Sequence, residues 1–121
     1  MTEIYRTTVT DAGSQAGAFI ADGLFVTFGE NAPEALADYC FIIEMNQTTA
    51  DLAVGQTFVV DGQRFPITAV GEAAQKNLNG LGHLTVNVDG GTEASLSGAI
   101  HIRCDEGAPQ PGIGSVFSVE A

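Results

Sequence analysis

Residues 58–65 of the chain read Phe58-Val59-Val60-Asp61-Gly62-Gln63-Arg64-Phe65. Two apolar runs flank the dipeptide Asp-Gly, which accepts the two positive φ angles of a type I′ turn. A turn of this type joins adjacent antiparallel strands, so these eight residues predict a tight β-hairpin. The second strand is expected to continue from Ile67 to Val70.

Further strand-like segments recur on both sides of the hairpin, with glycine-containing turns between them. They occupy residues 4–9, 23–29, 39–45, 84–88, 98–103 and 115–119. About eight short strands at such close intervals are typical of a barrel. We therefore expect a mainly β fold, a small single-domain barrel or barrel-like sandwich over residues 1–121, with one or two short helices.

Two segments have the composition of those short helices. Asn31-Ala32-Pro33-Glu34 resembles a helix start, in which Asn31 caps free N–H groups and Glu34 completes a capping box. Residues 72–78 are helix-prone, and Gly80 is placed to end that helix. No helix is expected to exceed about three turns.

Composition restricts the function. The chain has 121 residues and a net charge of −11, from 15 acidic residues against four Lys and Arg. This charge excludes most nucleic-acid binding, because affinity for phosphate backbones comes from clustered cations, and no nucleic-acid partner is expected. No segment is apolar for long enough to insert directly into a membrane, and the N-terminus lacks the pattern of a secretory signal, so a cytoplasmic protein is expected.

Metal or cofactor chemistry has little support in the sequence. Cys40 and Cys104 are too few for a disulfide framework, and their apolar or mixed neighbours predict buried or half-buried thiols. Together with His83 and His101 they show no zinc-ligand spacing. The glycines form neither a P-loop nor a dinucleotide fingerprint, so no cofactor or metal is expected.

Several segments together resemble one family, the glucitol/sorbitol-specific IIA components of the bacterial phosphotransferase system (PTS). The resemblance covers nearly the whole chain and lies in the order of segments with similar spacing. The segments are Ile4–Thr10, Gly23–Phe28, Asp38–Glu44, Arg64–Gly71, Leu81–His83, Ala99–Ile102 and Pro111–Val116. The resemblance implies a cytoplasmic IIA component that receives phosphoryl from the carrier HPr and passes it to a membrane-bound IIB/IIC sugar permease.

Position 43 departs from the family pattern. In the family, Tyr-Cys-Phe-Ile is followed by the histidine that carries the phosphoryl group, and a second histidine comes two residues later. Ile43 and Met45 occupy those places here, and an alkyl side chain has no lone pair with which to attack phosphorus. If residues 39, 41, 43 and 45 share a strand face, they form an apolar stripe that closes the site or presents a small contact surface.

The remaining imidazoles are secondary candidates. His83 opens a strand and could assist phosphoryl transfer, or it could be an ordinary hydrogen-bonded strand-end residue. His101 is expected to be structural, and Glu44 and the pair Asp105-Glu106 to be solvated carboxylates. The functional hypothesis is a IIA-type component unable to carry phosphoryl. The alternative is a non-catalytic binding or regulatory protein derived from that family, including recruitment of the barrel to bind a small ligand.

Overall fold

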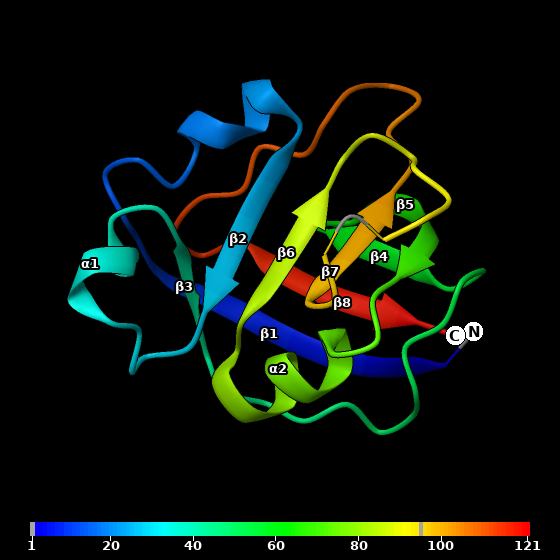
Figure 1. The fold of residues 1–121 in the computed structure, drawn as a ribbon, viewed down its shortest axis with the longest axis horizontal. Coiled ribbons are helices and arrows are strands. Elements are labelled where there is room, and N and C mark those ends of the chain that lie inside the picture. The colour runs from blue at the N-terminus through cyan, green and yellow to red at the C-terminus, as the bar shows by residue number, and fades with distance from the viewer. Residues whose placement is uncertain (1, 95) are drawn as a thin grey trace.

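The computed structural model describes residues 2–94 and 96–121 and has the form of a closed barrel (Figure 1). Its strands follow one another around the barrel in the order β1-β3-β2-β6-β7-β5-β4-β8. The strands are β1 (Glu3–Ala12), β2 (Leu24–Phe28), β3 (Phe41–Ile43), β4 (Thr57–Val60), β5 (Gln63–Val70), β6 (Leu84–Asn87), β7 (Ala99–Ile102) and β8 (Val116–Glu120). The helices are the 3-10 helix η1 (Ala18–Asp22), α1 (Glu34–Ala37) and α2 (Ala74–Leu81). The expected mainly β barrel with short helices is confirmed.

The hairpin between β4 and β5 has the expected turn. Asp61 and Gly62 have φ angles of 50° and 86°, and Val60 pairs with Gln63 across the turn. Both positive φ angles fall where the Asp-Gly pair was expected to supply them. The hairpin therefore places β4 directly beside β5.

Two of the strand pairs are parallel. β2 pairs with β3, and β6 pairs with β7, in the same direction, whereas the other pairings are antiparallel. Parallel neighbours need a crossover instead of a tight turn. The segment that contains α1 makes the crossover between β2 and β3, and as a result these two strands end at the same rim of the barrel.

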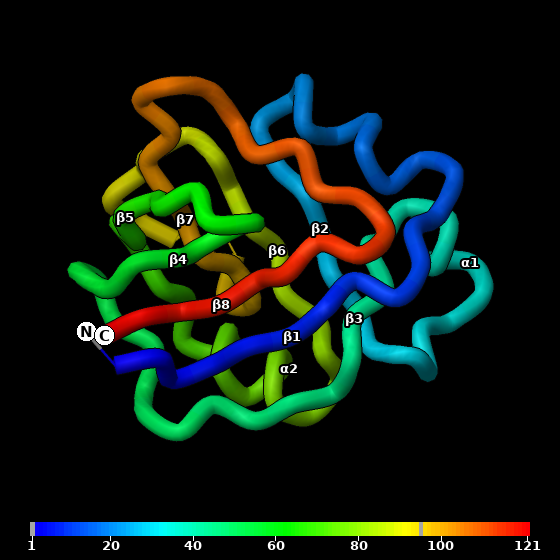
Figure 2. The backbone as a smooth tube through the Cα atoms, turned by 180° about the vertical axis from the view of Figure 1, so that it is seen from behind, coloured from blue at the N-terminus to red at the C-terminus, as the bar shows by residue number. Residues whose placement is uncertain are grey.

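Strand β8 closes the barrel between β1 and β4, and Figure 2 shows it lying along β1. Just outside the two strands, the Thr2 amide donates a hydrogen bond to the Ala121 oxygen at 3.2 Å, and the Ala121 amide donates to the Thr2 oxygen at 2.7 Å. The first and last strands in chain order are therefore neighbours along most of their length.

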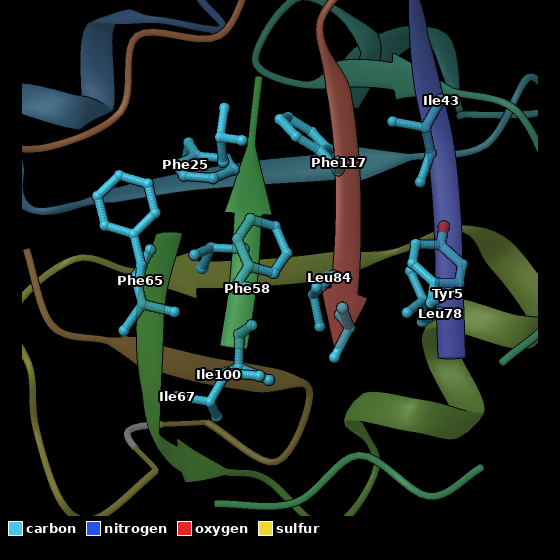
Figure 3. Packing of buried hydrophobic residues seen from close by; sticks show 14 of the residues in the cluster. Tyr5, Phe25, Ile43, Phe58, Phe65, Ile67, Leu78, Leu84, Ile100 and Phe117 are labelled. Carbon is cyan, nitrogen blue, oxygen red and sulfur yellow. The ribbon is translucent and has the colours of Figure 1, made fainter. Parts of the chain in front are cut away.

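The core fills the inside of the barrel with side chains from the inner faces of the strands (Figure 3). Phe25 is fully buried, and its ring centroid lies 6.0 Å from that of Phe41, 6.4 Å from that of Phe58 and 5.8 Å from that of Phe117. Aromatic pairs at these separations and tilted orientations add to the free energy gained by burying the rings. This cluster joins strands that are far apart in the sequence.

The predicted helix ends were wrong in two places. Asn31 does not cap α1: Pro33 takes the N-cap position, with φ −55° and ψ 139°, and no side chain caps the helix. A residue before a proline is disfavoured in helical conformation, and Ala32 precedes Pro33, so the helix cannot readily start before the proline. Asn31 lies instead in a preceding turn, in which the Ala32 amide donates to the Gly29 oxygen at 3.1 Å. α2 begins two residues later than expected and runs through Gly80.

The helix α2 ends instead at Gly82, which has a left-handed φ of 67°. The amide of Gly82 bonds to the oxygen of Leu78, and that of His83 bonds to the oxygen of Asn77. A glycine provides the left-handed conformation at little steric cost, and Gly82 lies at the point where the chain must turn into β6. Gly80, two residues earlier, is accommodated within the helix.

Candidate functional site

One rim of the barrel brings together the two segments that the sequence singled out. β2 and β3 end there because they are parallel, and β6 begins there because it is antiparallel to β2. The register pairs Phe28 with Ile42 and Thr27 with Leu84. Residues 43–45 and residues 82–83, about forty positions apart in the chain, therefore flank the end of β2.

His83 lies at this rim, directly before β6, as expected. Its Nδ1 is 3.2 Å from the backbone oxygen of Thr27, and its ring centroid is 4.8 Å from that of Phe28. A carbonyl can only accept, so Nδ1 carries the hydrogen in this pair, and in the neutral imidazole Nε2 then holds the lone pair. The half-buried ring could use Nε2 as a base, a hydrogen-bond acceptor or a nucleophile.

A junction of two glycines supports the loop of His83. The Gly29 amide donates to the Leu81 oxygen at 2.8 Å, and a Cβ at Gly82 would lie 2.7 Å from the Gly29 nitrogen. The thioether of Met45 packs against both glycines, and 41% of Met45 remains exposed. The residue two positions after Ile43 therefore lies beside the turn that carries His83.

Ile43 itself points into the barrel. It shares the inner face of β3 with Phe41, as expected, and only 1% of it is exposed. The longer stripe was wrong: Tyr39 and Met45 lie outside the three-residue strand and are 45% and 41% exposed. Strand geometry ends before it reaches them, so their side chains do not follow the alternation. Ile43 fills the core instead of presenting a contact surface.

An open groove of about 440 Å³ runs between β1 and the segment of residues 44–49. This segment is attached to the edge of β1 by hydrogen bonds. Glu44 N donates to Thr8 O at 3.2 Å, Thr7 Oγ1 donates to Glu44 O at 2.8 Å, and Asn46 Nδ2 donates to Arg6 O at 2.8 Å. Tyr5 and Thr7 of β1 are among the residues that line the groove.

His101 is not part of this rim. It pairs with Asn87, the last residue of β6, whereas His83 precedes the first. Its Nδ1 lies 2.7 Å from Asp89 Oδ1, and its Nε2 lies 3.5 Å from Asn87 Nδ2. The amide of Gly91 and the His101 ring hold the pKa of Asp89 below its ordinary value. This cluster, which joins the buried His101 to the exposed Asp89, ties a loop to the sheet.

The other candidate groups do not join the rim as a catalytic set. Glu44, Asp105 and Glu106 are exposed, and Cys40 and Cys104 are free thiols whose pKa values burial raises. Within residues 2–94 and 96–121, no group of three or more His, Cys, Asp or Glu could hold a metal ion. No helix in the same ranges has the length and apolar character needed to cross a membrane.

Sequence patterns alone missed Thr27, Gly29 and Gly82 as the support of His83. The only local signal was the Gly-His dipeptide at the end of a helix-prone segment. Thr27 also donates from Oγ1 to Gly82 O at 2.9 Å, which connects β2 to the turn. This contact depends on β2 and β6 being neighbours, which no local pattern indicates.

Comparison with known proteins places the chain in a family. The family described as "PTS system glucitol/sorbitol-specific IIA component" matches residues 4–118. The chain belongs to this family. The glucitol/sorbitol-specific EIIA components of Shigella flexneri and of Escherichia coli (strain K12) are each 40% identical to it over 124 aligned positions, which cover 100% of this chain and 98% of each relative.

A solved structure has the same fold as this IIA chain. The crystal structure of a PTS system IIA component from Enterococcus faecalis V583 superposes with a TM-score of 0.83, covering 97% of this chain and 100% of that one. The two sequences are 21% identical, so this likeness concerns the barrel fold alone.

Proposed function

We propose that this chain is a cytoplasmic IIA-type protein of a glucitol/sorbitol phosphotransferase system that has lost the phosphoryl acceptor at position 43. The whole of residues 1–121 acts as one IIA domain, and its partners are HPr and a membrane-bound IIB/IIC sugar permease. The proposal rests on membership of the family and on one observation at the candidate site.

That observation is the buried Ile43. In the family that the sequence resembles, a histidine at this place carries the phosphoryl group. Transfer from HPr breaks the P–N bond of the donor and forms a new P–N bond to an acceptor nitrogen, so an acceptor must have a lone pair. Ile43 has none, and its side chain is enclosed in the core.

His83 is a poor substitute for the missing acceptor. Its Nε2 can hold a lone pair, but its described contacts are the Thr27 carbonyl and the Phe28 ring. Neither contact donates a hydrogen bond to a phosphoryl oxygen, whereas transfer depends on donors that stabilise spread negative charge. We propose that His83 assists or lines the site and does not accept phosphoryl stoichiometrically.

Docking can survive the loss of the acceptor. Met45 and Leu81 expose apolar surface beside the His83 turn, and the net charge of −11 favours encounter with a basic partner surface. Interface free energy is concentrated in a few well-packed contacts, which need not include the acceptor. The same reasoning favours the second candidate, a non-catalytic regulatory protein that binds PTS partners without relaying phosphoryl.

The deciding experiment incubates the protein with phosphoenolpyruvate, enzyme I and HPr, followed by mass spectrometry under conditions that preserve phosphohistidine. We expect no stoichiometric phosphorylation of the native chain. Near-complete labelling of His83 would overturn the proposal, and His83→Gln is the control that assigns any label to that ring. Binding of unphosphorylated HPr, measured by calorimetry, tests docking separately.

The variant Ile43→His is the complementary test. HPr-dependent labelling of this variant would show that the docking surface persists and that only the acceptor is missing. Absence of both labelling and HPr binding would remove HPr from the proposed partners and leave the regulatory role with a different partner.

A further inference from the structure

Tyr5 is a buried polar residue that has no role in the function proposed above. It lies on the inner face of β1, where Tyr5, Thr7 and Val9 alternate with more exposed residues. Its hydroxyl is buried and forms no hydrogen bond with the described residues. Burial raises the pKa of Tyr5 to about 12, and the nearby Thr7 hydroxyl opposes that effect. The phenol is therefore neutral and able to donate a hydrogen bond.

The Tyr5 hydroxyl has no hydrogen bond of normal geometry within the described part of the chain. The nearby Thr7 hydroxyl donates its own hydrogen to the Glu44 oxygen at 2.8 Å; its oxygen keeps lone pairs that could accept, but no hydrogen bond joins it to Tyr5. In Figure 3 the oxygen of Tyr5 points toward Ile43, and the Ile43 side chain points back toward it. Both belong to the same core cluster, and an alkyl group cannot accept a hydrogen bond.

An unpaired buried hydroxyl is unfavourable, because it loses its bonds to water without replacing them. A tyrosine at this place becomes favourable when the side chain that its hydroxyl faces has a nitrogen or oxygen that can accept. Position 43 pairs with Val9, which shares the inner face of β1 with Tyr5, and the Tyr5 oxygen points toward it (Figure 3). Tyr5 and Thr7 also line the groove beside β1.

We propose that Tyr5 is the positioning residue for position 43: its hydroxyl is placed to donate to a polar side chain there, and Ile43 leaves it unpaired. This inference rests on the proposed function in that it concerns the acceptor position of the family. In a chain with an imidazole at position 43, the Tyr5 hydroxyl bonds one ring nitrogen, fixes the ring orientation and leaves the other nitrogen for chemistry.

A double-mutant cycle tests the proposal without any PTS enzyme. The four proteins are the native chain, Tyr5→Phe, Ile43→His and the double variant, and the measurement is urea unfolding at pH 7.5. In the native background, Tyr5→Phe should leave the unfolding equilibrium constant unchanged or lower it, because it removes an unpaired hydroxyl. In the Ile43→His background, the same substitution should raise it by about fivefold, because it breaks a hydrogen bond.

Two further variants keep the cycle decisive. Tyr39→Phe removes a hydroxyl from a residue that is 45% exposed and should have no effect in either background. Ile43→Gln supplies an acceptor without a ring and should show coupling of the same sign. If both polar variants at position 43 fail to fold while Tyr5 is present, Tyr5 does not receive a polar side chain and the proposal is wrong.

The imidazole of Ile43→His provides a second readout. ¹⁵N NMR should show one nitrogen acting as a hydrogen-bond acceptor, and Tyr5→Phe should abolish that signature. Equal destabilisation by Tyr5→Phe in both backgrounds would mean that the hydroxyl already has a partner, such as a bound water, and would overturn the proposal. Because no outcome depends on HPr, failure here is distinct from failure of the proposed function.

Discussion

His101 and Asp89 hold a loop against the outer face of the barrel through a hydrogen bond of 2.7 Å between Nδ1 and Oδ1. His101 is 2% exposed on β7, whereas Asp89 lies on the loop that follows β6. The Gly91 amide donates to the same Asp89 oxygen at 2.9 Å, and Thr68 Oγ1 donates to Gly91 O at 2.6 Å. One carboxylate thus connects the loop, its turn and the sheet.

This arrangement predicts an acid-sensitive contribution to stability. The pKa of Asp89 is lowered first by the Gly91 amide and then by His101, so the folded state favours the carboxylate. A lowered folded-state pKa stabilises the protein above the unfolded value of about 3.9, and this contribution is lost as pH falls through the folded pKa. Asp89→Asn should be less stable than the native chain at pH 7, with the difference shrinking below about pH 4.

Urea unfolding at several pH values checks this prediction. Asp105→Asn is the matched control, because Asp105 is an exposed carboxylate whose ion pair with Arg103 lies at the surface. A pH-independent difference between Asp89→Asn and the native chain would show that the loop is held by contacts other than the carboxylate.

The two glycines at the end of α2 should respond oppositely to alanine. Gly82→Ala should destabilise by about 1–3 kcal/mol, because Gly82 has a φ of 67° and its new Cβ would meet the Gly29 nitrogen at 2.7 Å. Gly80→Ala should stabilise by about 0.5–1 kcal/mol, since Gly80 lies in the helix and a Cβ there meets no atom within 4 Å. Thermal or urea unfolding measures both, and equal signs would contradict the placement of the helix end.

The aromatic cluster should carry much of the stability. Phe25→Ala should cost about 3–5 kcal/mol, because it removes a fully buried ring that contacts three others and leaves a cavity among strands on different sides of the barrel. Phe19→Ala is the control, since that half-buried ring contacts Tyr39 at 5.7 Å outside the core. A loss for Phe25→Ala no larger than for the control would refute the importance of the cluster.

The proposed docking surface can be tested by adding charge. Leu81 is 51% exposed beside the His83 turn, so Leu81→Asp should weaken HPr binding at least about tenfold, by removing apolar contact and adding a carboxylate. Ile113→Asp is a matched change of an exposed apolar residue on the loop before β8, and it should leave binding unchanged. Equal effects of the two changes, measured by calorimetry, would place the docking surface elsewhere.

Local sequence patterns predicted the individual strands and turns of this barrel better than they predicted which strands pair with each other. Asp61-Gly62 determines a turn through the φ angles of two adjacent residues, so the hairpin could be predicted from eight residues. The parallel pairing of β2 with β3 depends on contacts such as Phe28 with Ile42, which no short-range pattern encodes. The ends of α1 and α2 were wrong because Pro33 and Gly82 compete with Asn31 and Gly80, and the tertiary position of the turn decides between them.

At the candidate site, too, the sequence predicted local features but not contacts between distant segments. The sequence located His83 at a strand start and placed Ile43 on the same face as Phe41. It could not indicate that Tyr5, nearly forty residues earlier, points at position 43, because that relation exists only after the barrel has closed. The exposure of Tyr39 and Met45 was missed for a simpler reason, since β3 ends after three residues and alternation does not extend beyond it.

The position of β8 between β1 and β4 has a consequence for biosynthesis. Until the last strand in chain order has been synthesised and has left the ribosome, β1 and β4 each present an unpaired edge to solvent. Such edges recruit other strands, and long-range pairings of this kind form slowly. A chain that stops after β7 would therefore expose both edges, and β8 protects the barrel from aggregation by pairing with them.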